Sequence, residues 1–174
     1  MSITFRLIFH QIIRLLFLST FSLIFLSCDV SIPVEVDSLS GNVVKIIDGD
    51  TYDLILNGEQ TRVRMYGIDA PERGMDYYRV AKDYLGELCN DQIIRLEVMN
   101  TDRYGRIVAK SFLSDGRELG AEMIKAGLAW HYKQYSDDES LALLENDAQE
   151  NKVGLWKATN PTPPWKYRKR KKEK

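Results

Sequence analysis

The chain has few of the residues that bind zinc or form disulfide bonds. Its 174 residues include two histidines and two cysteines. His10 lies in a segment that we expect to be an export signal, and His131 stands alone, so the sequence predicts no zinc site. Cys28 directly follows that segment, and if it is modified, Cys89 has no intrachain partner. We therefore expect a domain that folds without a disulfide.

Long hydrophobic runs are also missing. The apolar stretch over residues 15–26 has about 12 residues, fewer than the roughly 20 that a membrane-spanning helix needs. Arg6, His10 and Arg14 precede it, and Ser27 closes it. A basic front, a short apolar run and a small residue are typical of an export signal, which we place at residues 1–27.

Cys28 comes directly after this signal. A cut before it would leave Ser27 and Phe25 at the two positions where ordinary signals need small residues, and Phe25 is a poor fit. The arrangement instead resembles a bacterial lipoprotein signal, in which Cys28 becomes the lipidated first residue. We therefore expect an exported protein that is anchored to the membrane of the cell envelope, with residues 28–40 as a tether. A plain secreted form is the alternative.

Charge is distributed unevenly along the chain. The sequence has 24 Lys and Arg residues and 25 Asp and Glu residues, yet the part after Trp165 holds seven basic residues and one acid. Between the signal and this part, acids exceed bases by nine. An acidic body attracts nucleic acid poorly, so a polyanionic substrate would need a local basic site, a metal ion or the tail.

The tail, residues 158–174, is rich in proline and then basic. We expect it to be disordered. Three roles stay open for it: a solvated chain end, capture of nucleic acid, and contact with anionic lipid.

Alternating apolar residues predict five short strands. They cover residues 42–47, 51–56, 60–68, 93–99 and 107–113. Asn57-Gly58, between the second and third strands, is a strong hairpin signal. Five short strands with a helix inserted after the third are typical of an oligonucleotide-binding-type β-barrel.

About three helices are expected beside this barrel, which makes the fold class α+β. Apolar positions spaced by three and four residues predict a helix over residues 77–88, capped by Asp76. A shorter helix over residues 118–126 ends at Gly127. A capping-box pattern that begins at Ser136 predicts a last helix running to Asn151.

Acids and arginines gather in two places. Asp48-Gly49-Asp50 separates the first two strands, and the segment from Arg64 to Glu72 follows soon after. Carboxylate oxygens suit hard cations such as Ca²⁺ or Mg²⁺. By itself an Asp-Gly-Asp turn is most often only a turn. The second place is residues 102–106, where two further arginines follow an acid.

Taken together, these motifs resemble those of the staphylococcal nuclease (thermonuclease) family. Five pieces occur in the family's order and spacing between Gly41 and Trp156. They are Ile47-Asp48-Gly49-Asp50-Thr51, Val63-Arg64 through Ile68-Asp69-Ala70-Pro71-Glu72, Asp102-Arg103-Tyr104-Gly105-Arg106, Gly127-Leu128-Ala129 and Gly154-Leu155-Trp156. The resemblance implies a nuclease domain over residues 41–157, with a five-stranded barrel and three helices.

The resemblance also implies roles for the acidic positions. Asp50, Asp69 and the backbone carbonyl of Ala70 would bind Ca²⁺, with Asp48 as a supporting acid. Glu72 would act as the general base that orients or deprotonates the attacking water.

Basic and aromatic positions would hold the substrate. Arg64 and Arg106 match the two arginines that grip the scissile phosphate, because a planar guanidinium can donate two hydrogen bonds to phosphate oxygens. Arg103 and Tyr104 would contact the terminal phosphate and base. The candidates for stacking on a base are Tyr135, Trp130 and Tyr132.

These roles predict a metal-dependent nuclease, with Ca²⁺ as cofactor, that cleaves DNA and RNA with little sequence specificity. The resemblance implies products with 3′-phosphates. We expect a monomer without a protein partner. Two alternatives stay open: a non-catalytic nucleic-acid-binding barrel anchored at the cell surface, and a surface barrel that binds a protein.

The lipoprotein expectation can be checked on the native N-terminus. We expect mass spectrometry of the protein from its own host to find a chain that begins at Cys28 and carries acyl groups. The physical reason is that the apolar run is too short to anchor the protein by itself. An unmodified Cys28 would rule the lipid anchor out.

Overall fold

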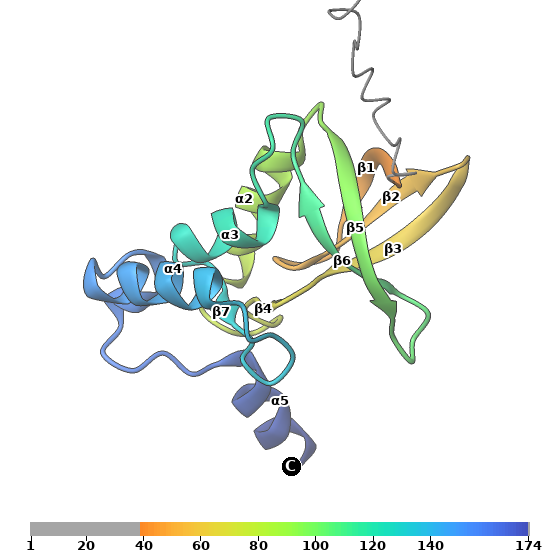
Figure 1. Ribbon diagram of the computed structural model, residues 1–174. Helices are drawn as coiled ribbons and strands as arrows, with labels where there is room; N and C mark the ends of the chain where they lie inside the picture. Colours follow the sequence, from red (N-terminus) through yellow and green to blue (C-terminus); the bar gives the residue numbers. More distant parts are fainter. Residues whose placement is uncertain (1–38, 174) are drawn as a thin grey trace, which may run out of the picture. The chain divides into compact units, whose positions relative to one another are not determined.

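The computed structural model describes residues 39–173, and Figure 1 shows them as a coloured ribbon. The expected export signal, Cys28 and almost all of the expected tether lie outside these residues. Among the residues that are described, no helix has the length and hydrophobicity that crossing a membrane requires.

Five strands form a closed barrel in the order β1-β2-β3-β6-β5. They are β1 (Ser40–Ile46), β2 (Thr51–Leu56), β3 (Glu59–Met65), β5 (Ile93–Thr101) and β6 (Ile107–Phe112). Neighbouring strands are antiparallel except for β3 and β6, whose parallel pairing closes the barrel. The prediction of a five-stranded barrel is confirmed.

The third strand is shorter than its hydrophobic pattern predicts. It ends at Met65, because Gly67 takes a positive φ of 76° and turns the chain. Ile68–Asp69 then form a separate strand, β4, which pairs with β7 (Trp130–His131) outside the barrel. This small ribbon carries Asp69 and joins the barrel to the helical part of the chain.

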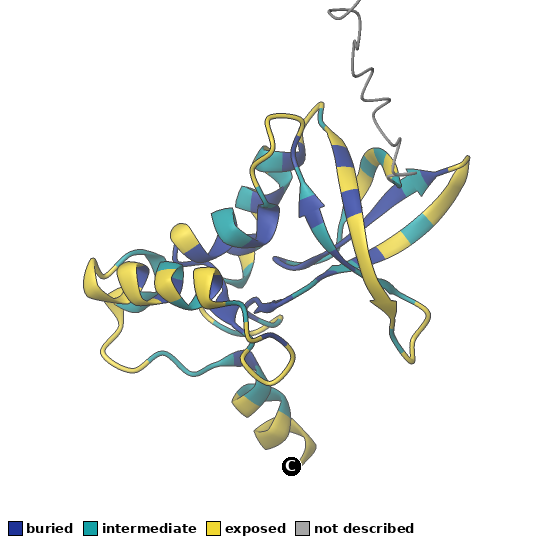
Figure 2. Ribbon diagram, viewed as in Figure 1, coloured by how far each residue is buried: buried dark blue, intermediate teal, exposed yellow. Residues whose placement is uncertain are grey.

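Three helices match the expected ones: α2 (Tyr78–Cys89), α3 (Leu119–Lys125) and α4 (Glu139–Glu150). All three lie on one side of the barrel in Figure 1. Figure 2 shows α3 as largely buried, whereas α4 is exposed on its outer face. The shared core therefore joins the barrel interior to the helices.

Both predicted helix caps are wrong in detail. Asp76 does not cap α2, because the N-cap residue is Tyr77, which has a φ of 63° and makes no side-chain cap hydrogen bond. At α4 the cap is Asp138, not Ser136: its carboxylate accepts a hydrogen bond from the Ser140 backbone N–H at 3.0 Å. Ser136 is buried instead and accepts from the Asp138 N–H at 3.3 Å.

Gly127 and Gly154, from the last two sequence motifs, allow their two segments to come into close contact. The Leu155 N–H donates to the Gly127 carbonyl at 2.9 Å. A Cβ on Gly127 would lie 2.3 Å from the Val153 carbonyl oxygen, and one on Gly154 would lie 2.3 Å from the Gly127 oxygen. The 3₁₀ helix η2 (Gly154–Lys157) therefore packs on the end of α3 through backbone contact, which only glycine permits.

The tail differs most from its prediction. Pro164–Lys172 form a helix, α5, where the sequence predicts disorder. Proline at its first turn fits that position because its φ is already helical. The Trp165 ring also stacks on Tyr132, with centroids 5.3 Å apart. Figure 1 shows α5 near the ribbon of β4 and β7.

Asp138 provides a test of the fold. Hydrogen bonds from Ser140 and Lys110 hold its pKa well below the ordinary range. The charged form therefore stabilises the native state above about pH 4, and this contribution is lost as the pH falls further. We expect Asp138→Ala to lower the free energy of unfolding by about 1–2 kcal/mol at pH 7 and by less at pH 3, measured by urea denaturation.

The control is Asp137→Ala, which removes the exposed neighbouring acid. It should change the free energy of unfolding by less than about 0.5 kcal/mol. Equal losses for the two variants would contradict the assignment of the cap.

Candidate active site

All but one of the residues that the sequence assigns to metal, catalysis and substrate line one cleft, and the exception is Trp130. Its volume is about 710 Å³, and its walls come from β3, β4, the loop after β4, the β5–β6 turn and α5. The predicted residues that it contains are Asp48, Asp50, Arg64, Asp69, Ala70, Glu72, Arg103, Tyr104, Arg106 and Tyr135. Segments that are distant in sequence therefore meet as the resemblance implies.

The Asp-Gly-Asp turn is held against the loop that follows β4. The Asp50 carboxylate accepts a hydrogen bond from the Ala70 N–H at 2.6 Å and one from the Thr51 hydroxyl at 2.9 Å. Gly49 allows the two segments to approach, because a Cβ there would lie 2.8 Å from the Cβ atoms of Ala70 and Ala81. Asp50 is 5% exposed and Asp69 is 1% exposed, so both acids are buried beside each other.

Arg64 lies between these two acids. Its Nη1 is 3.0 Å from Asp50 Oδ1, and its Nη2 donates to Asp69 Oδ1 at 3.0 Å. The register of the barrel places it there, since Arg64 pairs with Thr51 across β2 and β3. One guanidinium thus links the strand start, the barrel wall and β4.

The acids of the cleft outnumber this arginine. Burial, and then the charge of Asp50, raise the pKa of Asp48 to about 7. Burial also raises the pKa of Asp69, although the hydrogen bond from Arg168 opposes this effect. Close carboxylates with raised pKa values bind added positive charge well, because a cation relieves their repulsion.

The β5–β6 turn presents the second arginine. Asp102 accepts from the backbone N–H groups of Tyr104 and Arg106 at 2.8 and 3.0 Å and from Arg106 Nε at 2.7 Å. The Arg103 guanidinium lies over the Tyr104 ring, 4.9 Å from its centroid. Tyr104 is 70% exposed, so its outer face is available to a ligand.

The aromatic predictions have mixed outcomes. Tyr135 is 63% exposed and contacts Tyr132, with ring centroids 4.9 Å apart, at the edge of the cleft. Trp130 is not a stacking candidate, because it is buried against Trp156 and does not line the cleft. Tyr132 lines the cleft, but Trp165 covers its ring.

The family model of staphylococcal nuclease homologues matches residues 62–158 of this chain, a span that includes Arg64, Asp69, Glu72 and Arg106. The chain belongs to the staphylococcal nuclease family. An uncharacterized endonuclease of Escherichia coli is 38% identical over 139 residues, which is 80% of this chain and 91% of that protein. A micrococcal nuclease of Shigella flexneri is 33% identical over 153 residues, 82% of this chain and 87% of that protein.

A match over a shorter stretch of the chain comes from a plant. The staphylococcal-like nuclease CAN1 of Arabidopsis thaliana is 40% identical over 111 residues, which is 64% of this chain and 34% of that protein. The family resemblance that the five motifs indicate is therefore confirmed.

One residue of the cleft was missed at the sequence level. Arg168 of α5 donates to Asp69 Oδ1 at 3.0 Å, to Asp69 Oδ2 at 2.8 Å and to Glu72 Oε1 at 2.7 Å. Burial acts to lower its pKa, but these two acids raise it overall, so Arg168 stays charged. The sequence does contain a signal that could have found it: a proline and a tryptophan directly precede the basic run, and the rest of the domain is acidic.

Asp50 and Asp69 offer the oxygen ligands that a hard cation prefers, but in this structure arginines pair with both of them. Among residues 39–173, no three Asp, Glu, His or Cys side chains are arranged as a metal-ligand set. The oxygens of Asp50 and Asp69 accept hydrogen bonds from Ala70, Thr51 and the two guanidinium groups instead. Oxygen ligands, burial and surplus negative charge are what Ca²⁺ requires. The Arg168 guanidinium supplies a positive charge at that place.

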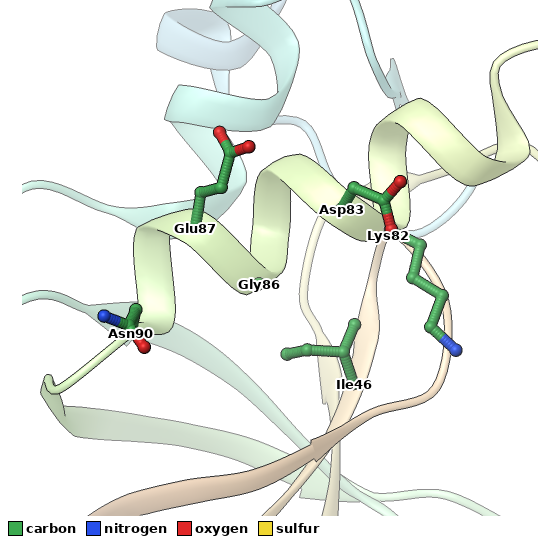
Figure 3. Close-up of a pocket in the computed structure, with 6 residues that line it drawn as sticks. All are labelled: Ile46, Lys82, Asp83, Gly86, Glu87 and Asn90. Carbon is green, nitrogen blue, oxygen red and sulfur yellow. The ribbon is translucent and has the colours of Figure 1, made fainter.

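A second hollow does not compete as a site. It has a volume of about 580 Å³ and lies beside β1 and α2. Figure 3 shows its residues, and there the carboxylate of Glu87 and the amine of Lys82 point in different directions. Side chains that do not converge cannot hold a small charged ligand together.

Arg64 is expected to be essential for stability. We expect Arg64→Met to lower the free energy of unfolding by about 3–5 kcal/mol at pH 7, because it leaves the buried Asp50 without its charged partner and removes one of the two arginines that pair with Asp69. Urea denaturation measures the change. In the control, Arg117→Met, an arginine that is 50% exposed loses partners at the surface, and the change in the free energy of unfolding should be much smaller. A small loss for Arg64→Met would mean that the acids do not depend on this arginine.

Proposed function

We propose that this protein is a calcium-dependent nuclease that hydrolyses DNA and RNA with low sequence specificity and leaves 3′-phosphates. That it is a phosphodiester hydrolase follows from its family and from relatives named endonuclease and micrococcal nuclease. The calcium ion, the range of substrates, the products and the role of each residue are the proposal.

One observation carries the proposal: two arginines and a group of carboxylates line the same cleft. Nucleophilic attack on a phosphodiester increases the negative charge on the phosphate oxygens. Arg64 and Arg106 would donate hydrogen bonds to those oxygens and remain charged throughout. Asp50 and Asp102 fix the directions of the two side chains before a substrate arrives, which avoids reorganisation during the reaction.

The carboxylates have two roles in this proposal. Asp50, Asp69 and the Ala70 carbonyl would hold Ca²⁺, which supplies Lewis-acid stabilisation of the phosphate when bound. The Ala70 N–H donates to Asp50 at 2.6 Å, and this contact, which keeps Ala70 beside that acid, supports the proposal. Asp48 hydrogen-bonds the Asp50 N–H at 3.2 Å and so supports the turn.

Glu72 is suited to act on water. Its side chain is 38% exposed, whereas that of Asp69 is 1% exposed. A carboxylate at the water-accessible edge of the cleft can accept a hydrogen bond from the attacking water and take its proton. We assign Glu72 as the general base on this ground.

Weak base selectivity follows from where the cleft holds its ligand. Its charged groups face phosphate, which carries no sequence information. The exposed rings of Tyr104 and Tyr135 would stack on bases of any kind, and Arg103 beside Tyr104 would contact a further phosphate. Both DNA and RNA fit this form of recognition.

We also propose that the protein is exported and held at the cell envelope through Cys28. The order of residues 6–28 supports this location. The nuclease would then act on nucleic acid outside the cell as a monomer.

Substitution in the cleft tests the reaction. We expect Arg106→Ala and Glu72→Gln each to lower kcat by about 100- to 1,000-fold, because each removes one group that acts in the transition state. The measurement is cleavage of single-stranded DNA, double-stranded DNA and RNA by the purified protein with Ca²⁺, Mg²⁺ or a chelator. Activity should need Ca²⁺ and be lost with the chelator.

Matched controls are available on the same chain. Arg117→Ala and Glu59→Gln change exposed residues that do not line the cleft, and their kcat should remain close to that of the unmodified protein. Activity that survives both cleft substitutions would show that the site is misplaced. Nucleic-acid binding without cleavage under every metal condition would favour the non-catalytic barrel.

A further inference from the structure

The C-terminal helix α5 enters the cleft that the proposed function uses. Arg168 and Lys172 of this helix line it together with the predicted site residues. Figure 1 shows α5 near the ribbon formed by β4 and β7, and β4 is the strand that carries Asp69. A helix in this place limits what else the cleft can hold.

Arg168 takes up the oxygens that a metal and a water would need. Both oxygens of Asp69 accept hydrogen bonds from its guanidinium, and Oδ1 also accepts one from Arg64. Glu72 accepts from the same Arg168 Nη1 at 2.7 Å. A guanidinium that pairs with both oxygens of Asp69 places a positive charge where the metal cation would bind, and the two cations repel each other.

The attachment of α5 is suited to release. Apart from the ion pairs of Arg168, the helix is held by the burial of Pro164, by the stacking of Trp165 on Tyr132 and by a 3.4 Å hydrogen bond from the Tyr167 hydroxyl to the Arg73 carbonyl. Its remaining basic residues lie side by side and repel one another. These basic residues are Lys166, Lys169, Arg170, Lys171 and Lys172. The docked helix therefore depends on the acids of the cleft.

We propose that α5 is an inhibitory strap, in which Arg168 occupies the place of the divalent cation and must leave before that cation binds. This proposal rests on the proposed function, because it takes Asp69 as a metal ligand. Cation binding and release of the strap are then linked, and each opposes the other to the same extent. At a low calcium concentration, α5 would stay docked in the cleft.

The coupling between Ca²⁺ binding and the release of α5 has a measurable size. The apparent dissociation constant for Ca²⁺ equals the intrinsic constant divided by the open fraction. If α5 is docked in about 90–99% of molecules, removal of Arg168 should tighten Ca²⁺ binding by about 10- to 100-fold. A purely structural Arg168 predicts the opposite, since its loss would loosen the acids and weaken binding.

Calorimetric titration of the purified protein with Ca²⁺ alone tests the strap. We expect Arg168→Ala to bind Ca²⁺ about 10- to 100-fold more tightly than the unmodified protein. Arg168→Lys keeps the charge but cannot bridge both acids, and should give an intermediate value. The control Lys169→Ala removes the same charge from an exposed position of α5 and should change the affinity by less than about 3-fold.

Tryptophan fluorescence provides a second readout that needs no activity. If Ca²⁺ releases the strap, Trp165 leaves Tyr132, and the emission should change during the titration. Trp165→Phe should lose this change, which assigns it to α5.

The outcomes separate the two proposals. Equal or weaker Ca²⁺ binding by Arg168→Ala would overturn the strap while leaving the nuclease proposal intact. If no variant binds Ca²⁺ and none cleaves nucleic acid with it, the calcium site is wrong and the strap fails with it. Tighter binding together with the Trp165 signal supports the strap.

Discussion

The contact of Arg64 with Asp50 and Asp69 is the interaction on which the rest of the cleft depends. It joins the start of β2, the barrel strand β3 and the outer ribbon β4 through one guanidinium. Without it, the nearly buried Asp50 would keep only a backbone and a hydroxyl donor, and Asp69 would keep only Arg168. Charges removed from water in this way are tolerated only when they are paired. The fold and the proposed chemistry therefore rely on the same residue.

The barrel fixes this contact through its register. Arg64 pairs with Thr51 across β2 and β3, and neighbouring residues of β3 alternate between the barrel interior and its outer face. A shift of one residue would exchange these faces, so Val63 and Met65 would leave the core and Arg64 would enter it. The Asn57-Gly58 hairpin, with both residues at positive φ, determines the pairing that prevents this shift. A local turn thus sets the position of a distant charged group.

Sequence patterns predicted what depends on local order. The five strands and three helices follow from periodicity, and the cleft residues from motifs whose spacing matches the family. Three features escaped because they depend on partners far along the chain. The helix α5 looks disordered by composition, yet Asp69 and Glu72 pair with its Arg168. Trp130 looks available for stacking, but Trp156 buries it. Asp138, which caps α4, also pairs with Lys110 of β6. None of these partners is visible from neighbouring residues.

The uneven charge of the sequence has a single physical explanation in the cleft. Acids that bind a hard cation tightly must be close together and poorly hydrated, and this arrangement raises their energy when the cation is absent. Arg64 pairs with two of these acids, while burial, and then the charge of Asp50, raise the pKa of Asp48. A basic tail next to an acidic body supplies the missing positive charge in the form of Arg168. In the proposed mechanism, the acidity that would suit the cleft to a metal also makes it a binding site for the chain's own C-terminal helix, and the two cations would compete for the same oxygens.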